Sequence, residues 1–150
     1  MKIVIGSDHR GYSAKESLKQ FLGAQGHQVA DVGTASAKSC DYPDSAFEAA
    51  KKVASGEAEL GVLLCGSGIG MSIAANKVPG IRAALCHDEL TTEMARRHNN
   101  ANILCLPADL IGGALIQRMI EVWLRTPFEG GRHQQRIEKI ATIEQRAEKR

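Results

Sequence analysis

The sequence predicts one α/β domain built on a parallel, doubly wound sheet. Short apolar runs alternate with amphipathic segments of helical length along the chain, and this alternation is typical of βαβ units. Glycine or small polar residues end most of the apolar runs, as expected where a strand passes into a loop. A length of 150 residues with 43% hydrophobic content suits a single domain with a sizeable core.

We expect strands at residues 2–5, 27–32, 61–64, 81–86 and 102–106, each of which contains apolar residues and is short. Helices should fill the intervals, at residues 12–23, 44–54, from the loop after residue 70 to about 77, 91–97, 110–124 and 132–149. In the second helix, Asp44 or Ser45 is the expected N-cap, and Phe47 should face inward with Ala50 and Val53. The preceding Tyr42-Pro43 argues against helix before residue 44.

The last predicted helix, at about 131–149, is highly charged, but Ile137, Ile140 and Ile143 recur at helical spacing. This stripe suits docking on a neighbouring subunit better than a closed monomer core, so the helix should protrude. The elements together predict a Rossmann-like, three-layer fold with a five-stranded parallel sheet and a protruding C-terminal helix.

Composition excludes several classes of protein. A formal charge of +2 without an early basic cluster does not indicate nucleic-acid binding. No apolar stretch reaches the length of about 18 residues that a membrane span needs, and the first residues lack a signal-peptide core. The four cysteines form no CxxC pair, which indicates reduced thiols and a cytoplasmic protein. The five histidines show no ligand spacing, so we expect no metal site.

The stretch Cys65-Gly66-Ser67-Gly68-Ile69-Gly70 follows the third predicted strand and precedes a helix. Three interpretations compete: a dinucleotide-binding loop, a purely structural turn, and an anion or oxyanion pocket. Its spacing is GxGxG rather than GxGxxG, which disfavours the first. Glycines let main chain approach a ligand, and a helix start favours negative charge and lowers the pKa of a thiol. We therefore favour an oxyanion pocket with a reactive Cys65.

Other polar groups also follow predicted strands: Asp8-His9, Asp41-Tyr42 and His87-Asp88. Ligands of doubly wound sheets bind beyond the carboxyl ends of the strands, so we expect one crevice there. Arg132 and Arg136 are four residues apart and share a helix face. They suit either a bidentate phosphate clamp or an ordinary solvated basic face.

Several motifs, in order, resemble the ribose-5-phosphate isomerase type B (LacAB/RpiB) family of sugar-phosphate isomerases. They are IGSDHRGY, DYP, CGSGIGMSIAANK, GIRAALC, RRHNNANIL and EGGRHQQRI, which together cover nearly the whole chain. The resemblance implies aldose–ketose isomerisation of a phosphorylated pentose without metal or cofactor. It also implies a homodimer or dimer of dimers whose active sites are shared between subunits.

The resemblance also implies residue roles. Cys65 as thiolate would move a proton between carbons 1 and 2, while Ser67 and the N–H groups of the glycine loop stabilise the oxyanion. His98 would open the sugar ring with the assistance of Asp8. Substrate contacts would come from the remaining matched positions, which are His9, Asp41, Tyr42, Gly66, Gly68, Gly70, Asn99, Arg132 and Arg136.

One position departs from the family pattern. After the fifth predicted strand the family carries an arginine that joins the phosphate site, whereas this chain has Asp109. Asp109 is either the N-cap of the helix beginning at Leu110 or a residue that faces the substrate. In the second case it would pair with Arg132 or Arg136 or accept a hydrogen bond from a sugar hydroxyl. The substrate therefore stays open between ribose 5-phosphate, allose 6-phosphate and a tetrose phosphate. A non-catalytic module that binds a sugar phosphate or nucleotide is the alternative function.

Overall fold

The computed structural model describes residues 1–150 and contains five strands and six helices in alternation. The strands are β1 (Lys2–Ser7), β2 (Gln28–Asp31), β3 (Leu60–Cys65), β4 (Ala83–Leu85) and β5 (Ile103–Pro107). The helices are α1 (Tyr12–Ala24), α2 (Tyr42–Ala54), α3 (Ile69–Ala75), α4 (Glu89–Arg97), α5 (Gly113–Arg125) and α6 (Arg132–Glu148). All strand pairs are parallel, in the order β2-β1-β3-β5-β4. The predicted fold class is confirmed.

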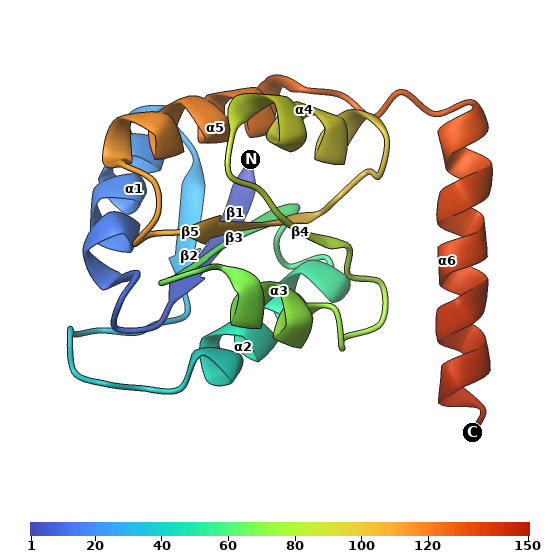
Figure 1. Ribbon diagram of the computed structural model, residues 1–150, viewed down its shortest axis with the longest axis horizontal. Coiled ribbons are helices and arrows are strands. Elements are labelled where there is room, and N and C mark those ends of the chain that lie inside the picture. The colour runs from blue at the N-terminus through green and yellow to red at the C-terminus, as the bar shows by residue number, and fades with distance from the viewer.

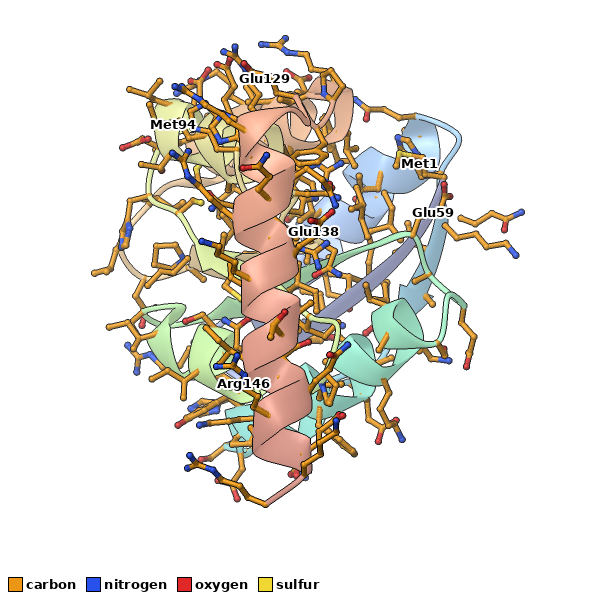
Figure 2. The ribbon with its side chains drawn as sticks, turned by 90° about the vertical axis from the view of Figure 1, so that its right-hand side faces the viewer. Met1, Glu59, Met94, Glu129, Glu138 and Arg146 are labelled. Carbon is orange, nitrogen blue, oxygen red and sulfur yellow. The ribbon has the colours of Figure 1, made fainter.

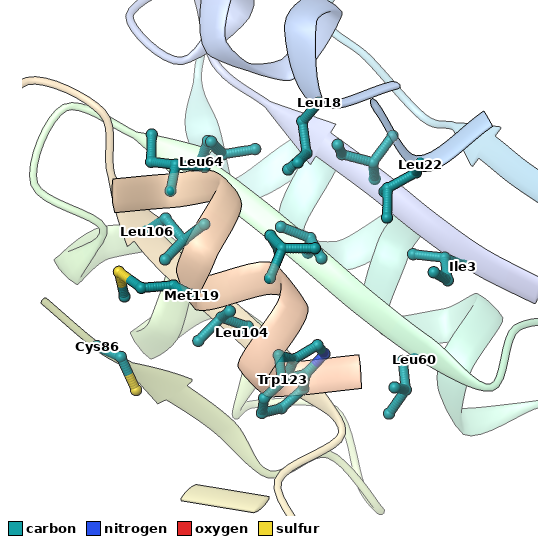
Figure 3. Close-up of a cluster of buried hydrophobic side chains, with 14 of the residues drawn as sticks. Ile3, Leu18, Leu22, Leu60, Leu64, Cys86, Leu104, Leu106, Met119 and Trp123 are labelled. Carbon is teal, nitrogen blue, oxygen red and sulfur yellow. The ribbon is translucent and has the colours of Figure 1, made fainter. Parts of the chain in front are cut away.

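Helices cover both faces of the sheet, with α1, α4 and α5 on one face and α2 and α3 on the other (Figure 1). Each face has its own apolar cluster. On the first face, Trp123 and Met119 of α5 pack with Leu104 of β5 and with Leu18 and Leu22 of α1 (Figure 3). On the second face small residues predominate, and the alanines of α2 and α3 let both helices lie close to the strands.

The strand order reverses between β1 and β3. The chain passes from β1 outward to β2, then returns to the other side of β1 as β3. In register, Ser7 at the end of β1 lies beside Leu64 of β3, and Cys65 lies beside Pro107 of β5. Such a switch point opens a crevice beyond the strand ends, where ligands of these folds bind. Asp8 and Cys65 therefore stand on its two sides.

Three local predictions were wrong. Helix α2 begins at Tyr42 with Asp41 as N-cap, because proline is well tolerated in the first turn of a helix. The Phe47 side chain is 50% exposed, since Ala46, Ala49 and Ala50 form the buried face instead. Helix α5 begins at Gly113 with Gly112 as N-cap, so Asp109 does not cap it.

Helix α6 stands apart from the body, at the end of the sheet opposite the loop that follows β3 (Figure 1). It extends from the α4 and α5 layer toward the α2 and α3 layer (Figure 2). His133 and Ile137 are its only buried residues, and near its other end Glu144 accepts hydrogen bonds from the Gly80 N–H at 3.1 and 3.3 Å. No helix of the structure has both the length and the apolar character that a bilayer span requires.

Candidate active site

Cys65 ends β3 at the switch point and lines a pocket of about 570 Å³. Its side chain is nearly buried, and Sγ accepts a hydrogen bond from the Gly68 N–H at 3.1 Å. This N–H is available because Gly68 adopts a φ of 74° as the N-cap of α3. The bond directs the positive end of the N–H dipole at the sulfur.

The loop around Cys65 supplies further donors. Ser67 Oγ accepts from the Ile69 N–H at 3.2 Å, which leaves the hydroxyl hydrogen free to donate. The Tyr42 ring lies directly against Gly70, where any side chain would overlap it. Both Tyr42 and Ser67 line the same pocket as Cys65. The structure therefore brings together the predicted thiol, hydroxyl, aromatic ring and glycine loop.

Asp8 lines this pocket from the end of β1 and is 6% exposed. Its Oδ1 accepts from the N–H groups of Arg10 and Gly11 at 2.9 and 3.1 Å, which shapes the turn into α1. Its Oδ2 has no hydrogen-bond partner within the protein and stays available to a ligand.

Arg10 and Asp109 also line the pocket, and they form an ion pair through Nε and Oδ2. The structure thus places Asp109 toward the pocket, as one of the two interpretations expected, but its partner is Arg10 rather than Arg132 or Arg136. Sequence reasoning missed Arg10, although it directly follows Asp8-His9 in the turn after β1.

His9 and Asp41 lie beside the pocket rather than in its lining. His9 Nδ1 accepts from the Cys40 N–H at 3.3 Å, which places the ring proton on Nε2 and leaves that N–H free to donate. Asp41 lines a neighbouring hollow with Ser45 and Cys40.

A second cluster contains His98, the C-cap of α4, and His133 of α6. The two rings stack with centroids 4.4 Å apart and an interplanar angle of 13°. Burial, followed by the neighbouring His98, lowers the pKa of His133, and His133 Nε2 is buried without a partner. Sequence reasoning missed His133, although it lies within the EGGRHQQRI motif.

Glu129 joins these two histidines, and the three potential ligand atoms lie within 4.8 Å of one another. The sequence spacing of the histidines gave no sign of this convergence. A metal ion binds in the plane of an imidazole ring, and the lone pairs of two nearly parallel rings do not meet at one point. The cluster would have to rearrange before it could hold an ion.

Arg132 and Arg136 are exposed near His133 and have no ion-pair partner in the chain. The side chain of Asn99 is exposed as well, while its carbonyl accepts from Arg82 Nε at 3.2 Å. Arg82 also contacts the Asn100 carbonyl at 2.9 and 3.1 Å. The segment after His98 is therefore held in place by Arg82, which directly precedes β4.

The two clusters lie at opposite ends of the sheet. Helix α4 returns the chain from the carboxyl end of β4 to the amino end of β5, so His98 and Asn99 lie away from the crevice. Because β3 has six residues, its ends are about 20 Å apart. One chain does not bring His98, Asn99, Arg132 and Arg136 together with Cys65.

The other cysteines lie outside the pocket. Cys105 is fully buried behind Cys65, and this burial, with Cys65 and Cys86 nearby, raises the pKa of its thiol. Burial likewise raises the pKa of Cys86. Both thiols stay protonated at neutral pH, and neither lines the pocket. Cys65 is therefore the one thiol placed to react with a ligand there.

Residues 3–140 match the family described as Ribose/Galactose Isomerase. The ribose-5-phosphate isomerase B of Escherichia coli is 43% identical over 145 residues, covering 97% of both chains. The ribose-5-phosphate isomerase B structure from Clostridium thermocellum is 48% identical, covers 98% of this chain and 99% of that one, and has a TM-score of 0.97.

A solved ribose-5-phosphate isomerase B from Mycoplasma genitalium, with bound ribulose-5-phosphate, is 41% identical and has a TM-score of 0.92, with 96% of each chain covered. The match spans the strand ends and the glycine loop as well as α4 and the first half of α6. This chain belongs to the Ribose/Galactose Isomerase family.

Proposed function

We propose that the protein is an aldose–ketose isomerase that interconverts ribose 5-phosphate and ribulose 5-phosphate. The observation that supports this most is the Cys65 thiol at the switch point, with the Gly68 N–H directed at its sulfur at 3.1 Å. The relatives named above as ribose-5-phosphate isomerases support the reaction class and the substrate. They support catalysis rather than simple binding of a sugar phosphate or nucleotide.

In the proposed reaction, the Cys65 thiolate takes the proton from C2 of the open-chain aldose. Negative charge then develops on O1 of the enediolate. The free hydroxyl hydrogen of Ser67 and the N–H groups of the loop would stabilise that oxygen, which is commonly the largest contribution to such catalysis. The thiol returns the proton to C1 while the hydroxyl proton of O2 moves to O1, and the ketose results.

The ring-opening group would come from a second copy of the chain. His98 is assigned to ring opening by the family resemblance, with Asp8 assisting as general acid–base catalyst. Because His98 and Asp8 lie at opposite ends of one sheet, the pair can meet only across an interface. We therefore propose a homodimer in which each site combines Cys65 and Asp8 of one subunit with His98 and Asn99 of its partner.

Exposed apolar residues support this association. On α6, Ile140 and Ile143 are 41% and 64% exposed, and on α3, beside the pocket, Ile69 and Ile73 are 52% and 58% exposed. Burying such side chains stabilises an interface by about 25 cal/mol for each Å² removed from water. Docking of α6 over the partner's pocket would cover both groups and bring its basic side chains to the substrate.

The phosphate would then lie between His9 Nε2 and the unpaired guanidinium groups of Arg132 and Arg136. Arginine binds phosphate through two parallel hydrogen bonds. This arrangement favours the phosphate-clamp interpretation of the two arginines over a solvated face.

Proton exchange in heavy water tests the proposal. Wild-type protein should introduce deuterium at the reacting carbon of the sugar phosphate and interconvert the two sugars. Cys65→Ala should lower the rate by about 10²–10⁴-fold or more, the usual contribution of a positioned acid–base group. Cys105→Ala is the matched control, since it removes a neighbouring buried thiol that does not line the pocket. Near-normal exchange in Cys65→Ala would exclude the thiol as the base.

A further inference from the structure

Arg10 and Asp109 meet at the mouth of the pocket that contains Cys65. Arg10 Nε donates to Asp109 Oδ2, and both groups lie against Gly66. A Cβ added at Gly66 would be 2.6 Å from Asp109 Oδ2 and 2.9 Å from Arg10 Nε. The backbone positions both residues: the Arg10 N–H donates to Asp8 at 2.9 Å, and the Asp109 N–H donates to the Gly66 carbonyl at 3.1 Å.

The Arg10 guanidinium keeps most of its donors free. A guanidinium has five N–H groups, and Asp109 takes only the one on Nε, since Nη1 and Nη2 have no hydrogen-bond partner in the chain. Among the side chains that line the pocket, Arg10 is the only cation, whereas Asp8 and Asp109 are both acidic. A dianion in this pocket therefore has one cationic side chain of the same subunit to meet.

The ion pair contributes little to folding. The two side chains are 59% and 38% exposed, and exposed pairs typically contribute between about 0 and 1 kcal/mol. The pair does fix the orientation of the guanidinium. Because the Asp109 carboxylate binds Nε, the edge that carries Nη1 and Nη2 is left free to bind a ligand.

We propose that Arg10 contacts the phosphate of the substrate and that Asp109 is the residue that positions it. This inference rests on the proposed function for the identity of the ligand, a sugar phosphate, and adds a binding residue to that site. Position 10 supplies the cation of this part of the site, and Asp109 orients it.

The charges favour this arrangement over a site without Arg10. A bare carboxylate at position 109 would repel a phosphate dianion a few ångströms away. With the guanidinium paired to it, the carboxylate becomes an orienting group.

Arg10→Gln tests the contact with phosphate. Two constants for inorganic phosphate should rise about 10-fold: its competitive inhibition constant and its dissociation constant measured by calorimetry. This is the lower end of the usual effect of losing a hydrogen bond to a charged group, because the site is open to water. The KM for ribose 5-phosphate should rise with them, with a smaller change in kcat. Arg118→Gln is the matched control, since Arg118 pairs through Nε with Glu89 at 2.9 Å, with side chains 55% and 45% exposed, away from the pocket.

A charge exchange tests the role of Asp109. Arg10→Asp alone places two carboxylates together and should weaken phosphate binding more than Arg10→Gln does. The double variant Arg10→Asp/Asp109→Arg restores one cation and one acid and should recover at least about 10-fold of that loss. Melting temperatures should stay close to wild type, because both positions are exposed.

Unchanged phosphate constants in Arg10→Gln, or a double variant no better than Arg10→Asp, would overturn the proposal. Its failure is distinguishable from failure of the proposed function. Calorimetry with inorganic phosphate reports on Arg10 even if no sugar phosphate is isomerised. If the wild type is active and Arg10→Gln binds phosphate as well as the wild type does, the role of Arg10 is refuted while the proposed isomerase function stands.

Discussion

Gly68→Ala should separate the geometry of the thiol site from general stability. Gly68 has a φ of 74° and donates its N–H to Cys65 Sγ. A left-handed backbone costs a residue with a Cβ about 1–2 kcal/mol. The added Cβ would also lie 2.5 Å from Leu85 Cδ1 and 3.1 Å from the backbone carbon of Leu106.

The two contacts differ in how they can relax. Leu85 Cδ1 is the far end of a flexible side chain and can move away, whereas the Leu106 backbone belongs to β5 in the centre of the sheet. Overpacking of this kind costs about 1–3 kcal/mol. Together the two terms predict a loss of about 2–5 kcal/mol in the free energy of unfolding.

Gly56→Ala is the matched control. Gly56 has a φ of 80° and no atom within 4 Å of an added Cβ, so it should lose only about 1–2 kcal/mol. Urea unfolding measures both losses, and proton exchange measures the activity. Gly68→Ala should be the less stable variant and should lose kcat, because the N–H moves away from the sulfur, while Gly56→Ala keeps its kcat. Equal stability losses with unchanged kcat in both variants would refute the reasoning.

Two further predictions concern buried charge. Lys15→Ala should destabilise the fold by about 3 kcal/mol, because it leaves a cavity in place of a fully buried long side chain and removes its contact with Asp31 at 2.6 Å. Lys51→Ala breaks an exposed pair with Glu48 and should cost less than about 1 kcal/mol. Equal losses on urea unfolding would contradict this. Burial lowers the pKa of His133 in the folded protein, so the unfolded chain binds that proton more readily, and stability should fall as the pH drops below about 6.5 and through the lower folded value. Denaturation between about pH 8 and pH 5.5 should show a smaller loss in His133→Gln than in wild type, and an identical loss would remove His133 from the explanation.

The sequence predicted the sheet well because burial on both faces leaves continuous apolar runs. Residues 61–64 and 103–106 are such runs. The strands predicted at 61–64 and 102–106 correspond to β3 and β5 with at most one residue added or removed at each end. Helix α2 was harder. Its alanines carry no strong hydrophobic signal, so Phe47 was assigned to the core although it is half exposed.

The positions of the candidate site residues were also predictable to different degrees. Cys65, Ser67 and Asp8 follow strands directly, so the rule about strand ends placed them correctly. Asp109 was harder to place because Gly112 and Gly113 delay the start of α5. Its partner Arg10 comes from a turn far away in sequence, which periodicity does not reveal. His133 stacks on His98 across 35 positions, a contact that depends on where α6 lies.

Mixing two inactive variants tests the shared site most directly. Cys65→Ala and His98→Asn should each lack isomerase activity on ribose 5-phosphate. After the two are unfolded together and refolded, hybrid dimers contain one site with both Cys65 and His98 intact, and random pairing in a two-fold dimer should restore about a quarter of wild-type activity. A mixture as inactive as its components, with hybrid dimers demonstrated, would contradict a site built from two subunits.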